Sequence, residues 1–193
     1  MDSFTRNTFT PCLLATGVGS MPHADVAEAC ALITRTLPES PFWPQLPKHS
    51  PLEDMNVQVS PGFPFLKIDE EKGVLEFDAG RDEAQELEKV YRAFLGDEPL
   101  PLPSSYAGGF EGMLRALQGK AGDLRFFKGQ MVGPVTFGLG IKDADGKDVI
   151  HNDVVFDGLL KALILRGRRL IQAMNTVCPR VVFFLDEPAL AGY

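Results

Sequence analysis

Residues 180–193 read Arg-Val-Val-Phe-Phe-Leu-Asp-Glu-Pro-Ala-Leu-Ala-Gly-Tyr, and this segment decides the predicted fold. Residues 181–185 include no polar side chain, which is typical of a strand covered on both faces in a parallel sheet. Asp186 and Glu187 follow at the carboxyl end of the strand, where parallel α/β folds place their chemistry. Pro188 cannot donate a ladder hydrogen bond, so we expect the strand to end there.

Strands and helices alternate upstream of this segment. Residues 12–18 are apolar and predict a first strand, which leads into the loop Gly19-Ser20-Met21-Pro22. Residues 126–132 predict another strand, which ends at Gly133-Pro134-Val135-Thr136. Right-handed crossovers would put the carboxyl ends of all three strands on one side of a parallel sheet. Apolar periodicity and capping residues predict the main helices over residues 26–37, 81–95, 110–117 and 153–177.

Two insertions interrupt this alternation. Residues 38–64 hold seven prolines together with aromatic residues, which predicts an ordered loop packed over an opening rather than a disordered linker. In that loop we expect Trp43 to pack on the surface and Gln45 to be able to hydrogen-bond a ligand. Residues 65–68 and 74–77 predict two short strands joined as a β-hairpin.

Size and composition favour one ordinary globular domain over residues 1–193. The chain is 45% hydrophobic and 23% charged, with a net charge of −7. Its length is short for a complete eight-fold α/β barrel, which needs about 250 residues. Basic residues cluster only at Arg166, Arg168 and Arg169, which we expect on the solvated face of a helix. We therefore expect no nucleic-acid partner.

The sequence also argues against a membrane or secreted protein. The longest apolar run, residues 158–165, is interrupted by Lys161 and is too short to span a bilayer. The N-terminus has no signal-peptide pattern. Cys12, Cys30 and Cys178 are too few and too far apart for a disulfide framework. We expect a cytoplasmic protein.

Two loops carry residue types suited to binding a small molecule. At Gly19-Ser20, backbone amides and a hydroxyl can hold a carboxylate or phosphate, although the pair also suits a simple tight turn. Asp186 and Glu187 point to opposite faces of a strand, so one can bind a substrate ammonium while the other ties down the scaffold. The alternative for these acids is an acidic helix N-terminus. The histidines and cysteines have no metal-site spacing.

Three motifs, in this order, resemble the cobalamin-independent methionine synthase family of the uroporphyrinogen decarboxylase/methionine synthase-like superfamily. They are Thr-Gly-Val-Gly-Ser-Met-Pro at 16–22, Gly-Pro-Val-Thr at 133–136 and Leu-Asp-Glu-Pro-Ala-Leu at 185–190. The resemblance implies a (β/α)8 TIM barrel. Residues 1–193 would form its N-terminal half as a single domain, with the hairpin and the Pro-rich loop as insertions.

The resemblance also implies an activity, namely methyl transfer from a folate-like donor to a thiol such as homocysteine, in methionine biosynthesis. Val18, Gly19 and Ser20 would hold the carboxylate of the amino acid, and Asp186, beside Glu187, would receive its ammonium group. The family uses zinc to form the thiolate. Its zinc ligands follow the last motif and are not in this chain, and no catalytic residue is identified. We therefore expect a fragment, or a truncated relative that covers its open sheet edge as a homo-oligomer.

Two other functions fit the same residues. One is a non-catalytic module that binds or senses an amino acid with a pocket derived from the same barrel. The other is a corrinoid-linked methyltransferase or a decarboxylase-like relative that shares the barrel.

Overall fold

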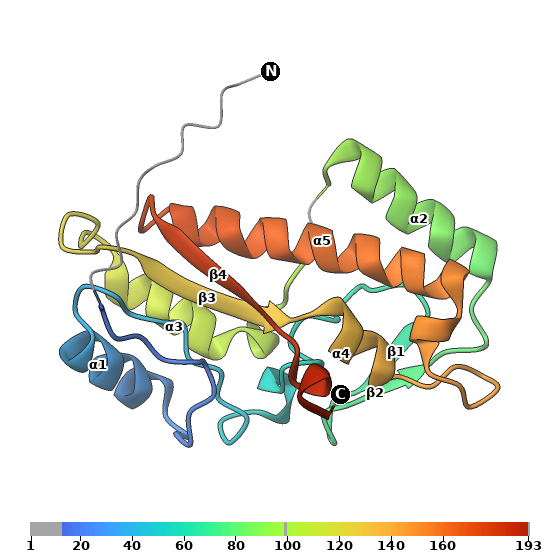
Figure 1. Ribbon diagram of the computed structural model, residues 1–193, viewed down its shortest axis with the longest axis horizontal. Helices are drawn as coiled ribbons and strands as arrows, with labels where there is room; N and C mark the ends of the chain where they lie inside the picture. The colour runs from blue at the N-terminus through green and yellow to red at the C-terminus, as the bar shows by residue number, and fades with distance from the viewer. Residues whose placement is uncertain (1–12, 99, 193) are drawn as a thin grey trace.

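The protein has a mixed α/β fold with five α-helices and two small, open, two-stranded sheets in the part that the structure describes (Figure 1). This structure is a computed structural model and describes residues 13–98 and 100–192. The helices are α1 Val26–Thr36, α2 Glu83–Gly96, α3 Gly108–Leu117, α4 Pro134–Leu139 and α5 Asp153–Asn175. The strands are β1 Leu66–Asp69, β2 Val74–Phe77, β3 Phe127–Val132 and β4 Val181–Asp186.

Strands β3 and β4 form the parallel pair that the sequence predicts. Their register runs from Phe127 opposite Val181 to Val132 opposite Asp186, so both strands end at the same level. Helix α5 connects them and lies along the pair in Figure 1. The predicted hairpin is also confirmed, because β1 and β2 pair in antiparallel register.

Two further segments extend this parallel arrangement without forming regular strands. Phe42 makes an isolated parallel bridge with Lys128 of β3, and Ser20 makes one with Gln45. The backbone N–H of Trp43 donates to the Lys128 carbonyl at 3.0 Å, and that of Gln45 donates to the Gly19 carbonyl at 3.0 Å. Four chain segments therefore run side by side in the same direction, in the order 13–20, 41–45, β3 and β4.

The prediction of a regular strand over residues 12–18 is wrong for its described part, residues 13–18. The neighbouring segment contains Pro41 and Pro44, which have no N–H to donate to a ladder. Side chains replace some of the missing bonds: the Thr16 hydroxyl donates to the Ser40 carbonyl at 3.0 Å, and the Ser40 hydroxyl donates to Ala15 at 2.6 Å. These bonds, together with those from Gln45 to the Gly19 carbonyl and from Lys128 to the Val18 carbonyl, hold the extended segment in place.

The described residues show the mixed α/β class of the predicted fold as two open two-stranded sheets, and they form no closed barrel. No strand pairs with the free edge of β4 among residues 13–98 and 100–192. The prediction that β4 is covered on both faces is wrong, because large apolar side chains of the strand are exposed. Phe184 is 44% exposed and Leu185 is 59% exposed. An apolar sequence thus marks an edge strand here, because nothing in the described part lies beyond it.

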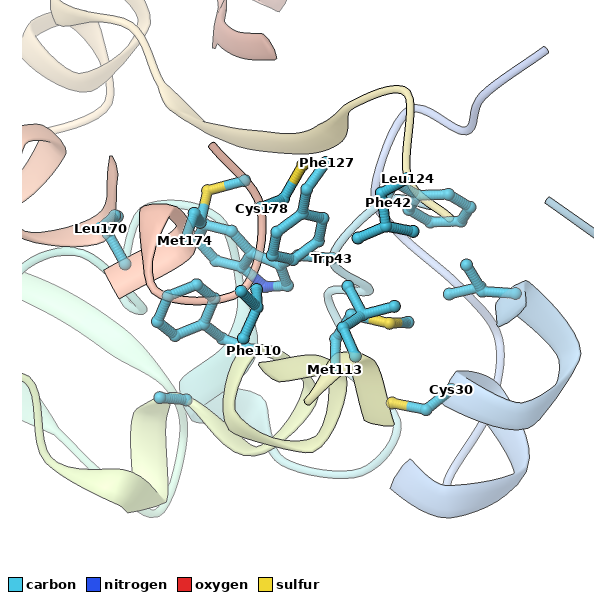
Figure 2. Close-up of a cluster of buried hydrophobic side chains, with 14 residues drawn as sticks. Cys30, Phe42, Trp43, Phe110, Met113, Leu124, Phe127, Leu170, Met174 and Cys178 are labelled. Atoms are coloured by element: carbon cyan, nitrogen blue, oxygen red, sulfur yellow. The ribbon is translucent and has the colours of Figure 1, made fainter. Parts of the chain in front are cut away.

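The Pro-rich loop contributes to the core instead of lying on the surface. Trp43 is fully buried, which corrects the expected surface position, and its ring centroid lies 4.7 Å from that of Phe110 in α3. Figure 2 shows Trp43 among side chains from α3, β3 and α5, including Met113, Phe127 and Met174. The loop is ordered, as predicted, because its aromatic and aliphatic side chains anchor it under the helices.

Helix α5 carries a buried arginine that the sequence placed on a solvated face. Arg166 is fully buried and donates to four backbone carbonyls, at 2.6 to 3.0 Å. These belong to Val59, Pro61, Leu100 and Pro101, so the guanidinium joins two irregular loops to the helix. No described helix is long and apolar enough to cross a membrane.

Candidate functional site

The residues that the sequence singled out lie at the carboxyl ends of the four parallel segments. Ser20 pairs with Gln45, and Val132 pairs with Asp186, at the ends of their respective segments. Because the segments run in the same direction, Ser20 and Asp186 lie on the same side of the arrangement. The arrowheads of β3 and β4 in Figure 1 point to this end, which we call the rim.

The two faces of the β3–β4 pair differ in what covers them. Phe127 packs with α3 and α5 residues in one cluster, and Met131 packs with α5 residues in another. Side chains alternate along a strand, so Lys128 and Gln130 lie on the opposite face, and the parallel register adds Phe184 and Asp186. We call this the inner face. The segment 13–20, rather than a helix, lies beside it.

Glycines let the first loop approach this inner face closely. A Cβ atom on Gly19 would lie 2.6 Å from Nε2 of Gln130, and one on Gly17 would lie 2.2 Å from the Phe42 ring. Gly19 is therefore required for packing, which is the simpler of the two readings of this loop. Its neighbours Val18 and Ser20 are exposed, so the loop also remains accessible to a small molecule.

Lys128 and Gln130 form a buried polar pair that the sequence analysis missed. Both are fully buried. The ammonium of Lys128 donates to the Val18 carbonyl and, at 2.8 Å, to Oε1 of Gln130, whose amide donates to the Trp43 carbonyl at 3.0 Å. The Phe184 ring centroid lies 4.6 Å from Nζ. The signal was present in the strand, because two polar residues at a spacing of two indicate a polar face.

Burial perturbs both charged groups of the inner face. Loss of hydration lowers the pKa of Lys128 to about 8, although the negative charge of Asp186 opposes this shift. Burial likewise raises the pKa of Asp186, against the effect of Lys128. The two groups influence each other without forming an ion pair. The carboxylate of Asp186 has no hydrogen-bond partner among the described residues.

Glu187 has a different environment from its neighbour. Its carboxylate accepts the backbone N–H of Val135 at 3.0 Å and that of Thr136 at 2.7 Å, at the start of α4. The Thr136 hydroxyl accepts the N–H of Ala189 at 3.2 Å. A Cβ atom on Gly133 would lie 2.2 Å from the Glu187 carboxyl carbon. Glu187 therefore ties β4 to α4, and Asp186 is the acid left for a ligand.

Gln45 is turned into the protein rather than toward open space. It is buried, and its amide donates to Oε1 of Gln58 at 2.9 Å. The amide nitrogen of Gln58 has no partner among the described atoms. This pair lies beneath the rim, at the end of the second parallel segment.

Zinc does not fit the residues that the structure describes. No group of three or more His, Cys, Asp or Glu residues able to hold a metal occurs within residues 13–98 and 100–192. Cys30 and Cys178 are free and buried, and burial raises the pKa of Cys30 to about 11. Cys12 lies outside the described residues. The described residues therefore offer zinc no binding site.

Comparison with known proteins gives no information about this site. No family model matches the chain, and neither a curated protein nor a solved structure shows significant similarity to it.

Proposed function

We propose that this chain supplies the amino-acid-binding part of a methyltransferase similar to cobalamin-independent methionine synthase, which methylates a thiol such as that of homocysteine. The observation that carries the proposal is Asp186. It is a half-buried carboxylate at the carboxyl end of a parallel strand, and no described residue hydrogen-bonds it. A carboxylate removed from water without a partner is stabilised by a cation, and an amino acid brings one.

The arrangement of the chain supports the same proposal. Four parallel segments with their carboxyl ends together are what the N-terminal half of a (β/α)8 barrel would contribute. The exposed Val18–Ser20 loop lies at the rim with Asp186, as the family resemblance requires of the substrate site. Glu187 supports this site indirectly, because it fixes the chain directly after Asp186.

Calorimetry on the purified chain tests the proposal. We expect homocysteine and methionine to bind, and we expect Asp186→Asn to weaken both by about tenfold or more, which corresponds to about 1.4 kcal/mol. Ser20→Ala should weaken binding less, since backbone groups share its role. Asp145→Asn, in the exposed loop before α5, is the matched control and should leave binding unchanged. Equal binding to the wild type and to Asp186→Asn would refute the proposal.

A methyl-transfer assay separates catalysis from binding alone. With a folate-like donor and added zinc, we expect no turnover from this chain by itself, because the described residues offer no metal site. Binding without turnover also suits the alternative of a regulatory amino-acid module. Restoration of turnover by a polypeptide that carries the metal ligands would favour the methyltransferase.

A further inference from the structure

Lys128 is a buried cation whose close partners are all neutral. It has no exposed surface, and its ammonium contacts a backbone carbonyl, an amide oxygen and the face of an aromatic ring. No carboxylate forms an ion pair with it among the described residues. Asp186 of β4 is the charged group that acts on it, from beyond ion-pair distance.

This environment is energetically unfavourable for an ammonium group that serves only packing. Buried charges are normally paired, and neutral acceptors return only part of the hydration that is lost. An apolar residue would avoid the loss of hydration, at the cost of leaving the Val18 carbonyl and Oε1 of Gln130 without this donor. The inner face instead holds a cation and an anion that are close enough to interact and too far apart to neutralise each other.

We propose that Lys128, which lies on the inner face below the rim, is the anion-binding group that receives the carboxylate of the ligand whose ammonium group Asp186 receives. The two charges then match the two charges of an α-amino acid, so the bound ligand gives each of them a partner of opposite charge. This inference rests on the proposed function for the ammonium half, but the anion-binding half stands on Lys128 alone. It differs from the sequence expectation, in which only the Val18–Ser20 loop holds the carboxylate.

The Val18 carbonyl shows how the carboxylate would reach Lys128. It accepts a hydrogen bond from Nζ and belongs to the exposed loop at the rim. A carboxylate that enters there replaces a neutral acceptor with a charged one, which strengthens the hydrogen bond. The Gln130 amide, fixed by Trp43, keeps Nζ in place during the exchange.

The test observes the lysine directly. In wild-type chain carrying ¹³C-labelled lysine, NMR follows the pH titration of each side chain, and the missing signal in Lys128→Arg assigns Lys128. We expect acetate to raise the pKa of Lys128, since a bound anion stabilises the ammonium, and we expect no such change with chloride at equal ionic strength. The exposed Lys48 provides the internal control. An acetate-independent titration of Lys128 would overturn the inference.

Ligand analogues then identify which anionic group is bound. Methionine has a carboxylate and no thiol, whereas 3-aminopropanethiol has a thiol and no carboxylate. We expect Lys128→Met to weaken the binding of methionine by about tenfold or more. The weaker binding of the aminothiol should stay unchanged. Lys128→Arg should retain part of the methionine affinity, and Lys48→Met should retain all of it. Loss of aminothiol binding alone would assign Lys128 to the thiolate and overturn the carboxylate assignment.

The two proposals fail in different ways. If amino acids do not bind but acetate still moves the Lys128 titration, the proposed function fails and the anion site stands. If amino acids bind through Asp186 while Lys128→Met binds as the wild type does, the proposed function stands and the anion site fails.

Discussion

Arg166 shows how much one side chain can hold in place. Its guanidinium joins residues 59–61 and 100–101 to α5, and burial lowers its pKa to about 10 while leaving it charged at neutral pH. Arg166→Met leaves four carbonyls without their donor, so we expect the free energy of unfolding to fall by about 3–5 kcal/mol. Urea denaturation followed by circular dichroism measures this loss.

Arg168→Met is the control for that experiment. Arg168 lies two residues away on the same helix, and its ion pair with Asp97 is exposed on both sides. An exposed pair contributes about 0–1 kcal/mol, so the change should be small. Similar losses for the two variants would show that the carbonyl contacts of Arg166 contribute little.

A second prediction at the residue scale concerns Lys128 and the pH dependence of the unfolding free energy. Its pKa of about 8 in the folded protein lies below the ordinary lysine pKa of 10.5. Between these values the unfolded chain binds the proton more tightly, so the contribution of Lys128 to stability rises with pH. Relative to Lys128→Met, the wild type should gain about 2 kcal/mol in unfolding free energy from about pH 7.5 to about pH 10. A pH-independent difference would contradict this assignment.

Comparison with Lys128→Met is essential because other groups titrate in the same pH range. Burial raises the pKa of Cys30 to about 11, which lowers stability as the pH rises above its ordinary value. This effect is present in both proteins and cancels in the difference.

At the scale of elements, Glu187 and Gly133 form a unit that joins β4 to α4. The Glu187 carboxylate accepts two N–H groups of the first turn of α4, and Gly133 leaves the space in which it lies. We expect Glu187→Ala to cost about 1–2 kcal/mol, as the loss of a helix cap does. Gly133→Ala should cost about 1–3 kcal/mol through overpacking.

The double variant tests whether these effects share one cause. Once Glu187 is alanine, a methyl group at position 133 no longer meets the carboxylate, so Gly133→Ala should become much less destabilising. Chemical denaturation of the wild type, both single variants and the double variant gives the coupling energy. Strict additivity would show that Gly133 is needed for another reason.

Elements with local signals were predicted well from the sequence. Asp25, Asp82 and Asn152 each cap a helix through a side-chain hydrogen bond, and α1, α2 and α5 begin close to where these caps suggest. Residues 13–18 failed because their pairing depends on a neighbour that contains prolines. Trp43 and Arg166 failed because burial is decided by distant segments, which local patterns do not report.

The candidate site also has one part that the sequence predicted and one part that it did not. The position of Ser20 and Asp186 on one side follows from the parallel direction of their segments, which the alternation of apolar segments and helices in the sequence predicts. Lys128 was passed over because a lysine in a strand is usually solvated. Its burial follows from the approach of Val18 and Gly19, more than a hundred residues earlier in the chain.

At the scale of the whole molecule, the parallel order of the described segments ends at an edge with which no other described strand pairs. Beside β4, on the side of α5, lies a groove of about 360 Å³ lined mainly by apolar side chains, including Leu163, Ile164, Phe183 and Leu185. Exposed edges of this kind pair with other chains unless charges or cover protect them. We therefore expect the chain to associate with itself as its concentration rises.

A charge placed on the edge should prevent that association. In Leu185→Lys the substituted side chain is already 59% exposed, so the fold should tolerate the change, while a lysine beside the free edge opposes strand pairing. Sedimentation velocity across a concentration series should show oligomers for the wild type and a monomer for Leu185→Lys. Leu95→Lys, at an 83% exposed position of α2, adds the same charge far from β4 and should associate as the wild type does. Equal association of all three proteins would place the contact elsewhere, because Leu185 is the one of the two substituted residues that lies in β4.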